Sequence, residues 1–313
     1  MRKREAIFAL IISCLFIGSV GIIIFHRQEL KVEEGTLFWI ETDLQTGASN
    51  LMACEFPDEE ISIFASLDRQ FEWDIIQEND GEIYLAKYSP EKELADIVLC
   101  LEGNLETINQ IKTPQQPIHK VLAIYNNEVY ISFIAGKNNG YNVFQIGRYN
   151  LEDKSIVMLG FELNTEEILH EPSISERGEI VYVRNKKLHL VNTEGEEKCL
   201  EETGRYPEWI EGEGKILYIH NDELFTMDSK TGEIDSLQSE NKESIKVKTK
   251  NLPGMVFSKN KEYIIYSAMD TSSMIHLDNF GIELRLIERK TGRDKIIRRE
   301  KGTKIKGDSI FWE

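Results

Sequence analysis

The chain has 313 residues, of which 54 are acidic and 37 are basic, giving a formal net charge of −17. This charge makes nucleic acid a poor partner, because the phosphate backbone would be repelled. The 41% hydrophobic and 29% charged content differs from disordered and fibrous chains, and four cysteines are too few for a disulfide scaffold. The composition is typical of an acidic globular protein with one large domain or two smaller ones.

Twenty consecutive uncharged residues, 6–25, follow a short basic N-terminus. At about 1.5 Å per helical residue, this run spans the ~30 Å hydrocarbon core of a bilayer. Arg2, Lys3 and Arg4 precede it, so the positive-inside rule keeps the N-terminus in the cytoplasm. The sequence predicts a single-pass cell-membrane protein with a cytoplasmic tail at 1–5, a transmembrane signal anchor at 6–25, a linker at 26–34 and an extracytoplasmic remainder.

Two alternatives for the N-terminus stay open. A cleaved signal peptide has an apolar core of about 7–15 residues and a small-residue cleavage site, and neither fits this segment. A lipoprotein signal would lead to acylation of Cys14, which follows Ile11, Ile12 and Ser13. Mostly apolar residues, rather than a polar tether, follow that cysteine.

The remaining cysteines are Cys54, Cys100 and Cys199. An odd number allows at most one intrachain disulfide in an oxidising compartment. Because a free cysteine behaves as a small apolar side chain, core positions are the simpler expectation for all three. Whether any two of them pair stays open.

A repeat organises the rest of the chain. Its clearest copies are Pro172–Val183, Pro207–Ile219 and Pro253–Ser267, and each is typical of a strand, a tight polar turn and a second strand. Two further short strands follow each copy. Four strands per unit, lettered A to D, are typical of a propeller blade.

Alignment of the second strands places one aromatic residue of each unit at the same position. The spacings between these residues lie between 36 and 52, which is close to the ~40–50 residues of one blade. Six units are therefore predicted, with the aligned residues Phe38, Tyr84, Tyr130, Tyr182, Tyr218 and Tyr266.

The two ends of this region complement each other. The first unit begins at Gly35 directly with a B strand, whereas Gly307–Glu313 has the pattern of an A strand without a following partner. Pairing them would close the ring and cover an exposed edge. The sequence therefore predicts an all-β, six-bladed β-propeller over residues 35–313, closed by pairing of the C-terminal strand with the first blade and preceded by one transmembrane helix.

The repeat unit resembles the TolB-like, or WD40-like, propeller repeat of bacteria, which has the form P-x-W-S-P-D-G-x-x-I-x-[FY] with a later D-x-x-T-G turn. Asp228–Gly232 matches the later turn, whereas Ser175–Gly178 and Glu211–Gly214 depart from the usual first turn. The resemblance implies a protein-docking platform, a solute receptor or the gate of a peptidase. Because no hydrolase domain follows the propeller, we expect one of the first two roles.

Sequence motifs for catalysis or metal binding are missing. No G-x-S-x-G elbow or C-x-x-C pair occurs, and the six histidines are isolated. The nearest calcium-like run, Asp278 to Glu283, has too few oxygen ligands. We therefore expect no catalytic residues, no cofactor and no metal site. Core packing is expected for the four tryptophans, Trp39, Trp73, Trp209 and Trp312.

Long B–C connections suggest where a partner binds. They are predicted in blades six, one, two and three, at Met269–Gly281, Thr42–Asn50, Tyr88–Ala95 and Gly136–Asn142, and would form a raised arc on one face. Apolar or amphipathic side chains in this arc are candidate partner contacts, namely Tyr141, Met274, Ile275, His276 and Phe280. The alternative is that these side chains fold back onto their blades.

A basic run occupies residues 285–306 of this otherwise acidic domain. It is suited to an anionic wall polymer or lipid headgroup, or else it forms a solvated outer strand that balances nearby carboxylates.

The function predicted from the sequence is non-catalytic docking of a protein or peptide at a bacterial cell surface. The bacterial assignment rests on the resemblance. A carbohydrate-active enzyme or a small-solute receptor that uses the channel mouth stays open as an alternative, and so does the oligomeric state.

Overall fold

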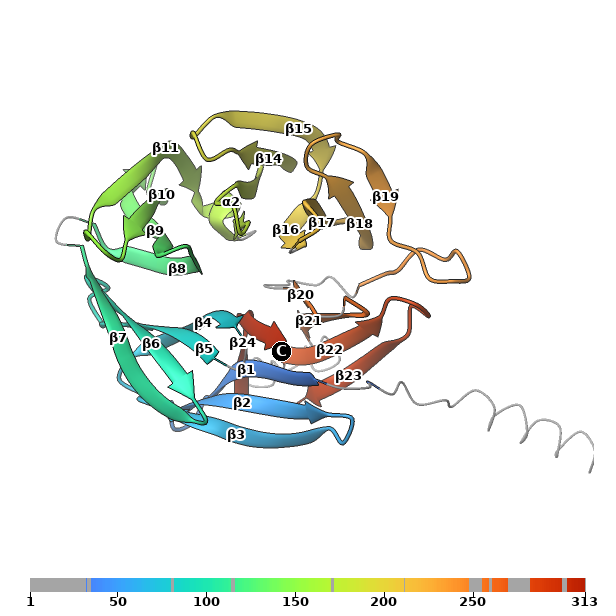
Figure 1. The fold of residues 1–313 in the computed structure, drawn as a ribbon, viewed down its shortest axis with the longest axis horizontal. Coiled ribbons are helices and arrows are strands. Elements are labelled where there is room, and N and C mark those ends of the chain that lie inside the picture. The colour runs from blue at the N-terminus through green and yellow to red at the C-terminus, as the bar shows by residue number, and fades with distance from the viewer. Residues whose placement is uncertain are drawn as a thin grey trace, which may run out of the picture. The chain divides into compact units, whose positions relative to one another are not determined.

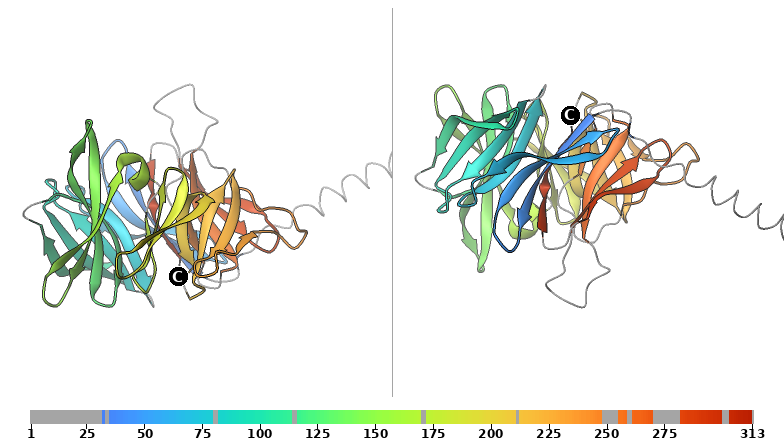
Figure 2. Two further views of the ribbon diagram at one scale, coloured as in Figure 1. Left: turned by 90° about the horizontal axis from the view of Figure 1, so that it is seen from above. Right: turned by 90° about the horizontal axis from the view of Figure 1, so that it is seen from below.

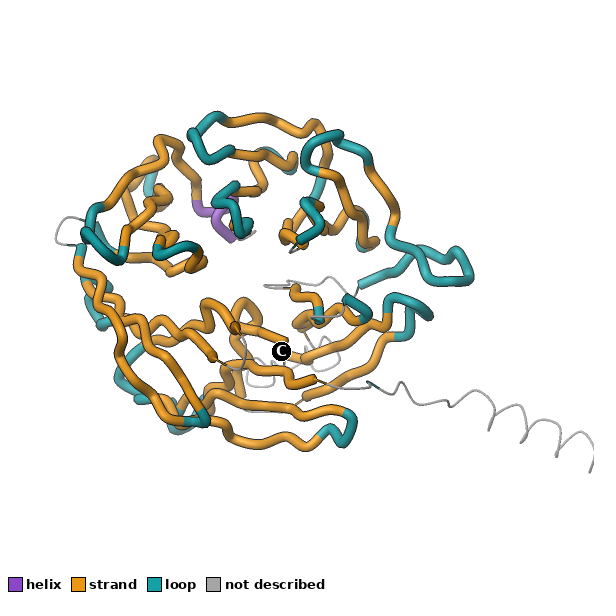
Figure 3. Tube along the Cα trace, viewed as in Figure 1, coloured by secondary structure: helices purple, strands orange, loops and turns teal. Residues whose placement is uncertain are grey.

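The computed structural model describes residues 32, 35–79, 82–113, 116–169, 172–210, 212–247, 255–258, 261–269, 282–299 and 303–312. Regular structure in these ranges is almost wholly β-strand, together with the short helix α2 (Thr165–Leu169) (Figure 3). The strands belong to one compact unit, Glu33–Glu313.

The expected cytoplasmic tail and membrane anchor, residues 1–25, lie outside the described residues, as does the expected linker 26–34 except for residue 32. In the ranges given above, no helix is long and apolar enough to cross a membrane. The membrane anchor therefore stays a prediction.

Six four-stranded antiparallel sheets surround a common centre and form the blades of a β-propeller (Figure 1). Strands are lettered A to D from the centre outward. Blade 1 contains β24 (Thr303–Trp312), β1 (Gly35–Asp43), β2 (Ser49–Phe56) and β3 (Glu60–Leu67). Blade 2 contains β4 (Glu72–Asn79), β5 (Glu82–Tyr88), β6 (Leu94–Leu101) and β7 (Asn104–Lys112). Blade 3 contains β8 (Ile118–Tyr125), β9 (Glu128–Asn138), β10 (Tyr141–Asn150) and β11 (Ile156–Asn164).

The other three blades follow the same order. Blade 4 contains β12 (Ser173–Ile174), β13 (Ile180–Arg184), β14 (Lys187–Val191) and β15 (Glu197–Thr203). Blade 5 contains β16 (Arg205–Ile210), β17 (Lys215–His220), β18 (Glu223–Asp228) and β19 (Ile234–Ser236). Blade 6 contains β20 (Met255–Phe257), β21 (Tyr263–Met269), β22 (Ile282–Glu288) and β23 (Asp294–Arg299). The predicted all-β, six-bladed propeller is confirmed.

The first and last strands of the propeller meet in blade 1. β24 pairs antiparallel with β1, with Trp39 opposite Ile310, and after a register shift Glu41 lies opposite Ile305. Both isoleucines are buried. The C-terminal strand is therefore the A strand of the first blade, which confirms the predicted closure.

Ion pairs from blade 6 add to this closure. The Arg298 guanidinium donates to both carboxylate oxygens of Glu41, at 3.2 Å from Nε and 3.0 Å from Nη2. Trp39 Nε1 donates to the same buried carboxylate at 3.2 Å. Lys295 of blade 6 also pairs with Glu59 of blade 1. Polar contacts thus cross the interface at which the ring closes.

The six aligned aromatic residues all lie in B strands, as the repeat predicted. In blades 4 and 6 the tyrosine hydroxyl donates to the acid that begins the D strand of the same blade. Tyr182 reaches Glu197 at 2.7 Å, and Tyr266 reaches Asp294 at 3.3 Å. This bond links the second strand of the blade to its outermost strand.

Blade 5 has no acid at the corresponding position. Its D strand begins at Ile234, and the Tyr218 hydroxyl is buried without a hydrogen-bond partner among the described residues. Burial, with a smaller contribution from the charge of Glu202, raises the pKa of Tyr218. The hydroxyl therefore carries a desolvation cost that no hydrogen bond offsets.

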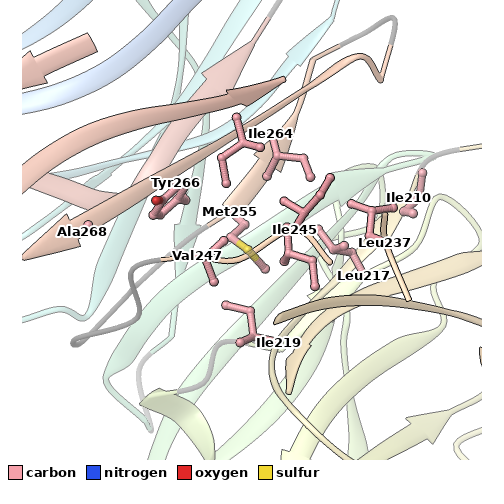
Figure 4. Close-up of a cluster of buried hydrophobic side chains, with 12 residues drawn as sticks. Ile210, Leu217, Ile219, Leu237, Ile245, Val247, Met255, Ile264, Tyr266 and Ala268 are labelled. Carbon is pink, nitrogen blue, oxygen red and sulfur yellow. The ribbon is translucent and has the colours of Figure 1, made fainter. Parts of the chain in front are cut away.

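The interface between blades 5 and 6 holds a cluster of buried apolar side chains (Figure 4). Leu237, Ile245 and Val247, which follow the short strand β19, pack there with Met255 and Tyr266. The chain beyond β19 therefore completes the outer part of this interface, which a three-residue D strand leaves uncovered.

Several side chains predicted for the core are found there. Trp39, Trp73 and Trp209 are buried, as are Cys54 and Cys100. Cys199 is partly buried, and these three cysteines are free thiols. The side chain of Trp312 lies outside the described side chains.

Removal of residues 303–313 should open the ring, because β1 loses its partner strand and the burial of Ile305 and Ile310. Each buried isoleucine contributes about 1.5–3 kcal/mol, so we expect the free energy of unfolding to fall by at least ~3 kcal/mol. Thermal unfolding followed by circular dichroism measures the loss, and a synthetic peptide of residues 303–313 should restore part of it. Unchanged melting would contradict the closure.

The substitution Tyr218→Phe should leave stability unchanged or raise it, because it removes a buried hydroxyl that lacks a partner. The matched substitution Tyr182→Phe should lower the free energy of unfolding by about 1–3 kcal/mol, because it leaves Glu197 without one of its donors. Urea unfolding of the two variants measures both values. Equal losses in the two variants would show that Tyr218 does make a hydrogen bond.

Candidate docking face

The B–C turns and the D–A connections emerge on one face of the propeller, the B–C face, and the A–B and C–D turns emerge on the opposite face, the A–B face. In blades 4 and 5 the B–C turns are Asn185-Lys186 and Asn221-Asp222, and φ is positive at all four residues. This geometry is that of two-residue hairpins in which Asn and Asp tolerate the left-handed region. The predicted tight turns of these blades are confirmed.

The prediction of a long loop at Gly136–Asn142 in blade 3 is wrong. Strands β9 and β10 continue through it and are joined by a two-residue turn at Asn139-Gly140, with φ of 50° and 85°. An Asn-Gly pair at a hairpin turn forms without strain, so the glycine and asparagines do not interrupt the strands. Blade 3 therefore carries a long hairpin rather than a long loop.

The remaining predicted loops are shorter than expected or are not described. In blade 1 the Asp43 carboxylate accepts from the amides of Gln45 and Thr46, which makes residues 44–48 a compact turn. In blade 2 the connection is Ser89–Glu93. Blade 6 residues 270–281, with the candidate contacts Met274, Ile275, His276 and Phe280, lie outside the described residues.

Tyr141 is the candidate partner contact that the structure does describe. It is the first residue of β10, and its side chain is 69% exposed. The flanking strands stop short of it, since β8 pairs with β9 only as far as Phe133 and β11 pairs with β10 only from Val143. The end of the hairpin therefore projects from the B–C face, on the side that carries α2 (Figure 2).

Helix α2 lies in the connection from blade 3 to blade 4, at the base of this hairpin. Asn164 Oδ1 accepts from the Glu167 amide, and Glu167 Oε2 accepts from the Asn164 amide, both at 2.9 Å. This reciprocal capping box fixes the start of the helix. Thr165 Oγ1 donates to the carbonyl oxygen of Asn142 in the hairpin at 3.2 Å.

Arg184, at the end of β13, joins α2 to blade 4. Its Nε donates to Glu167 Oε1 at 3.1 Å, its Nη2 to the Glu162 carbonyl at 2.5 Å and its Nη1 to Glu197 Oε1 at 3.0 Å. Glu197 also accepts from Tyr182 and is 2.6 Å from His189 Nδ1. Burial opposes ionisation of Glu197, but these hydrogen bonds and the charge of Arg184 outweigh it and lower the pKa of this carboxyl.

A second polar group lies on the B–C side of the interface between blades 2 and 3. The buried Tyr88 hydroxyl accepts from the Val121 amide at 2.8 Å and is hydrogen-bonded to Asp74. Burial and the charge of Asp74 raise the pKa of Tyr88 well above its ordinary value. Lys92 pairs with Glu72 at 2.7 Å. Glu72 and Asp74, both in β4, thus make contacts within the protein.

His119 lies in β8, the A strand of blade 3. Its Nδ1 is 3.1 Å from Ser132 Oγ, and its ring packs edge-on against Phe144 with 4.7 Å between centroids. Burial first, and then the charges of Lys92 and Lys120, lower the pKa of His119 to about 4, although Asp74 and Glu72 act in the opposite direction. The imidazole is therefore neutral at physiological pH.

Charge divides the two faces of the propeller. Among the described residues, exposed carboxylates on the A–B face outnumber exposed cations there. The carboxylates are Asp58, Glu60, Glu102, Glu152, Asp153, Glu176, Glu194, Glu196, Glu213, Glu233 and Glu262, and the cations are Lys154, Arg177, Lys230, Lys290 and Arg293. On the B–C face Asp68, Glu91, Glu93, Glu166 and Asp222 are balanced by Arg69, Lys112, Lys137 and Lys186. Within the described ranges, the B–C face is thus the more nearly neutral of the two.

Much of the predicted basic run 285–306 makes ion pairs within the protein. Buried Arg285 pairs with Glu283 and Asp294, and Arg299 also pairs with Glu283. Together with the Arg298–Glu41 and Lys295–Glu59 pairs, these contacts favour the structural alternative over an anionic polymer or lipid ligand. Removal of one partner from such a buried pair is costly, because the other charge stays desolvated.

The outer rim of the propeller exposes apolar side chains on its first three blades, including Ile63, Ile108 and Val157. However, the pairing of the D strand with the C strand contains a register shift in blades 1, 2, 3, 4 and 6. Such bulges twist an edge strand and hinder the addition of another strand. The rim is therefore a poorer docking surface than the projecting hairpin.

No group of three or more His, Cys, Asp or Glu side chains in the described ranges could hold a metal ion.

Stability should depend on the protonation of His119. Its pKa of about 4 lies below the ordinary value of 6.5, so folding favours the neutral ring. As pH falls from about 6.5 to 4, the unfolded chain binds a proton that the folded chain does not, and about 3 kcal/mol of stability should be lost. Urea unfolding at pH 7 and pH 4.5, compared between the wild type and His119→Gln, isolates this loss. If the wild type and His119→Gln lost the same free energy of unfolding between pH 7 and pH 4.5, the predicted role of His119 would be contradicted.

The chain matches no protein-family model and no curated protein. Its fold, however, is similar to solved structures. TolB from Acinetobacter baumannii has a TM-score of 0.61 and 13% identity, over 89% of this chain and 66% of that one. A candidate TolB from Agrobacterium tumefaciens has a TM-score of 0.56 and 10% identity, over 90% of this chain and 98% of that one.

These similarities bear on the fold alone, because the identities are low. They agree with the resemblance of the repeat to TolB-like propellers. The projecting hairpin and its base were identified from the geometry of this chain, and neither solved structure contributes to that assignment. The comparisons therefore establish that the chain has a TolB-like propeller fold.

Proposed function

We propose that this chain is a membrane-anchored, extracytoplasmic propeller that docks a protein or peptide through its B–C face. The observation that carries the proposal is the exposed aromatic side chain of Tyr141 on a hairpin that projects from a rigid base. Tyrosine is enriched at the energetic centres of protein interfaces, because it buries a large area and loses little side-chain entropy. Segment 6–25 would supply the anchor, as its length and flanking charges predict.

The point at which the chain enters the propeller supports the choice of face. Gly35 begins β1, a B strand, and B strands run from the A–B face to the B–C face. The N-terminal segment therefore joins the propeller on the A–B side. The point of attachment at Gly35 is thus on the face opposite to the B–C turns.

The charge of the two faces points in the same direction. An acidic A–B face would repel other acidic proteins, whereas the balanced B–C face permits close apolar contact. The resemblance to TolB-like propellers implies a docking role as well. That support is independent of Tyr141, because it rests on the repeat and not on the hairpin.

The enzyme alternative has less support in the described residues. The carboxylates nearest the start of β4 are Glu72, which pairs with Lys92, and Asp74, which is hydrogen-bonded to Tyr88. A glycosidase needs two carboxylates that face its substrate. Carboxylates held by neighbouring side chains serve the packing of blades 2 and 3 instead.

Site-specific photo-crosslinking in native membranes tests the proposal. A photoreactive amino acid at position 141 of the full-length chain should capture one partner in stoichiometric amount. The same amino acid at Ile63, which is 58% exposed on the outer strand β3, is the matched control and should capture none. The substitution Tyr141→Ala should reduce capture from a neighbouring position, Lys137, by at least ~10-fold, as for loss of an interface anchor. Equal capture at 141 and 63 would contradict docking at the hairpin.

A further inference from the structure

The hairpin that carries Tyr141 receives support from outside its own sheet. Toward the tip of the hairpin, β10 has no ladder partner on β11 before Val143, and β9 has none on β8 after Phe133. The one backbone bond that supports β9 there among the described residues joins the Ile134 amide to the Pro117 carbonyl. On the β10 side, the hydroxyl of Thr165 donates to the Asn142 carbonyl, one residue from Tyr141. An isolated two-stranded hairpin is only marginally stable in water, so this contact matters for its order.

Thr165 is itself held in place. It is the first residue of α2, and the capping box between Asn164 and Glu167 encloses it. The Glu167 side chain is buried, and its second oxygen accepts from Arg184 Nε. A charge-assisted bond of this kind is about twice as strong as a neutral one. The position of the threonine hydroxyl therefore depends on Glu167 and, through it, on Arg184.

Arg184 belongs to blade 4 and is fixed there. Its guanidinium bonds both oxygens of Glu197, at 3.0 and 3.1 Å, and lies 5.0 Å from the centroid of the Tyr182 ring. It also donates to the Glu162 carbonyl of β11 in blade 3. Arginine can make these contacts simultaneously because its planar group carries five donors. Lysine could not replace all of them.

These contacts form a continuous path from blade 4 to the tip of the blade 3 hairpin. We propose that Arg184, Glu167 and Thr165 hold the β9–β10 hairpin in one conformation and so pre-organise Tyr141 for its partner. Arg184 and Thr165 are positioning residues, since neither is the exposed contact. A hairpin already ordered before binding loses less conformational entropy when the partner docks. The inference rests on the proposed docking function for its purpose, but the path can be tested without a partner.

Hydrogen–deuterium exchange of the full-length chain in detergent micelles tests the path directly. The substitution Thr165→Val keeps the size of the side chain and removes the donor to Asn142. Peptides that cover residues 134–143 should then exchange about five-fold faster, as expected when one hydrogen bond is lost. Arg184→Gln should have the same local effect, whereas Thr165→Ser keeps the hydroxyl and should preserve the wild-type rate.

A matched control lies on the same face. Arg205 pairs with Asp222 in blade 5, away from the hairpin, so Arg205→Gln should leave exchange of residues 134–143 unchanged. The proposal is overturned if Thr165→Val leaves the hairpin as protected as in the wild type. It is also overturned if exchange rises equally in all six blades, because that would be loss of global stability.

Partner binding is measured separately, by the crosslinking from position 141. Faster hairpin exchange with weaker crosslinking in Thr165→Val supports both the path and its role in docking. Suppose instead that exchange is faster in Thr165→Val but that crosslinking in the otherwise wild-type chain is equal from positions 141 and 63. This result would support the path and contradict the docking function. The two failures are therefore distinguishable.

Discussion

Closure of the ring is the constraint on which the rest of this propeller depends. Clusters of buried apolar side chains join consecutive blades from blade 1 to blade 6, so an open ring would leave the outer faces of blades 1 and 6 uncovered. The ring is closed by β24, the last strand of the chain, which pairs with β1, the first. The Arg298–Glu41 contact joins blade 6 to blade 1 at the same interface. Once this joint holds, every other interface is fixed on both sides.

Local sequence patterns were sufficient to predict the fold. Alternating apolar residues, two-residue turns and one aromatic residue per unit all depend on neighbours that lie close in sequence. The turn at Asn185-Lys186 and the buried position of Tyr182 follow from such patterns. Ring closure was predictable because a missing A strand at one end and an unpaired strand at the other satisfy each other. Each of these signals was therefore readable without knowledge of long-range contacts.

The site was less predictable, for two physical reasons. Glycine and asparagine in residues 136–142 indicated a loop, but an Asn-Gly pair at 139–140 forms a turn that lets both strands continue. The capping box Asn164-x-x-Glu167 is visible in the sequence, but its place at the base of the hairpin depends on the fold. The contacts of Arg184 with Glu162 and Glu167 join blade 4 to blade 3 and to α2, and a single sequence contains no signal for such pairs.

Polar contacts between and within the blades explain why the hairpin can be rigid at all. Apolar burial at a blade interface is non-directional, whereas a hydrogen bond to a buried group is lost when donor and acceptor separate. Tyr182, Arg184 and Glu197 fix blade 4 in this way, and Glu167 transmits that position to α2. Blade 5 shows the opposite case, because Tyr218 is buried without an acceptor among the described residues. The rigid, polar part of the propeller therefore lies beneath the hairpin that projects from the B–C face, where a preformed contact is of most use.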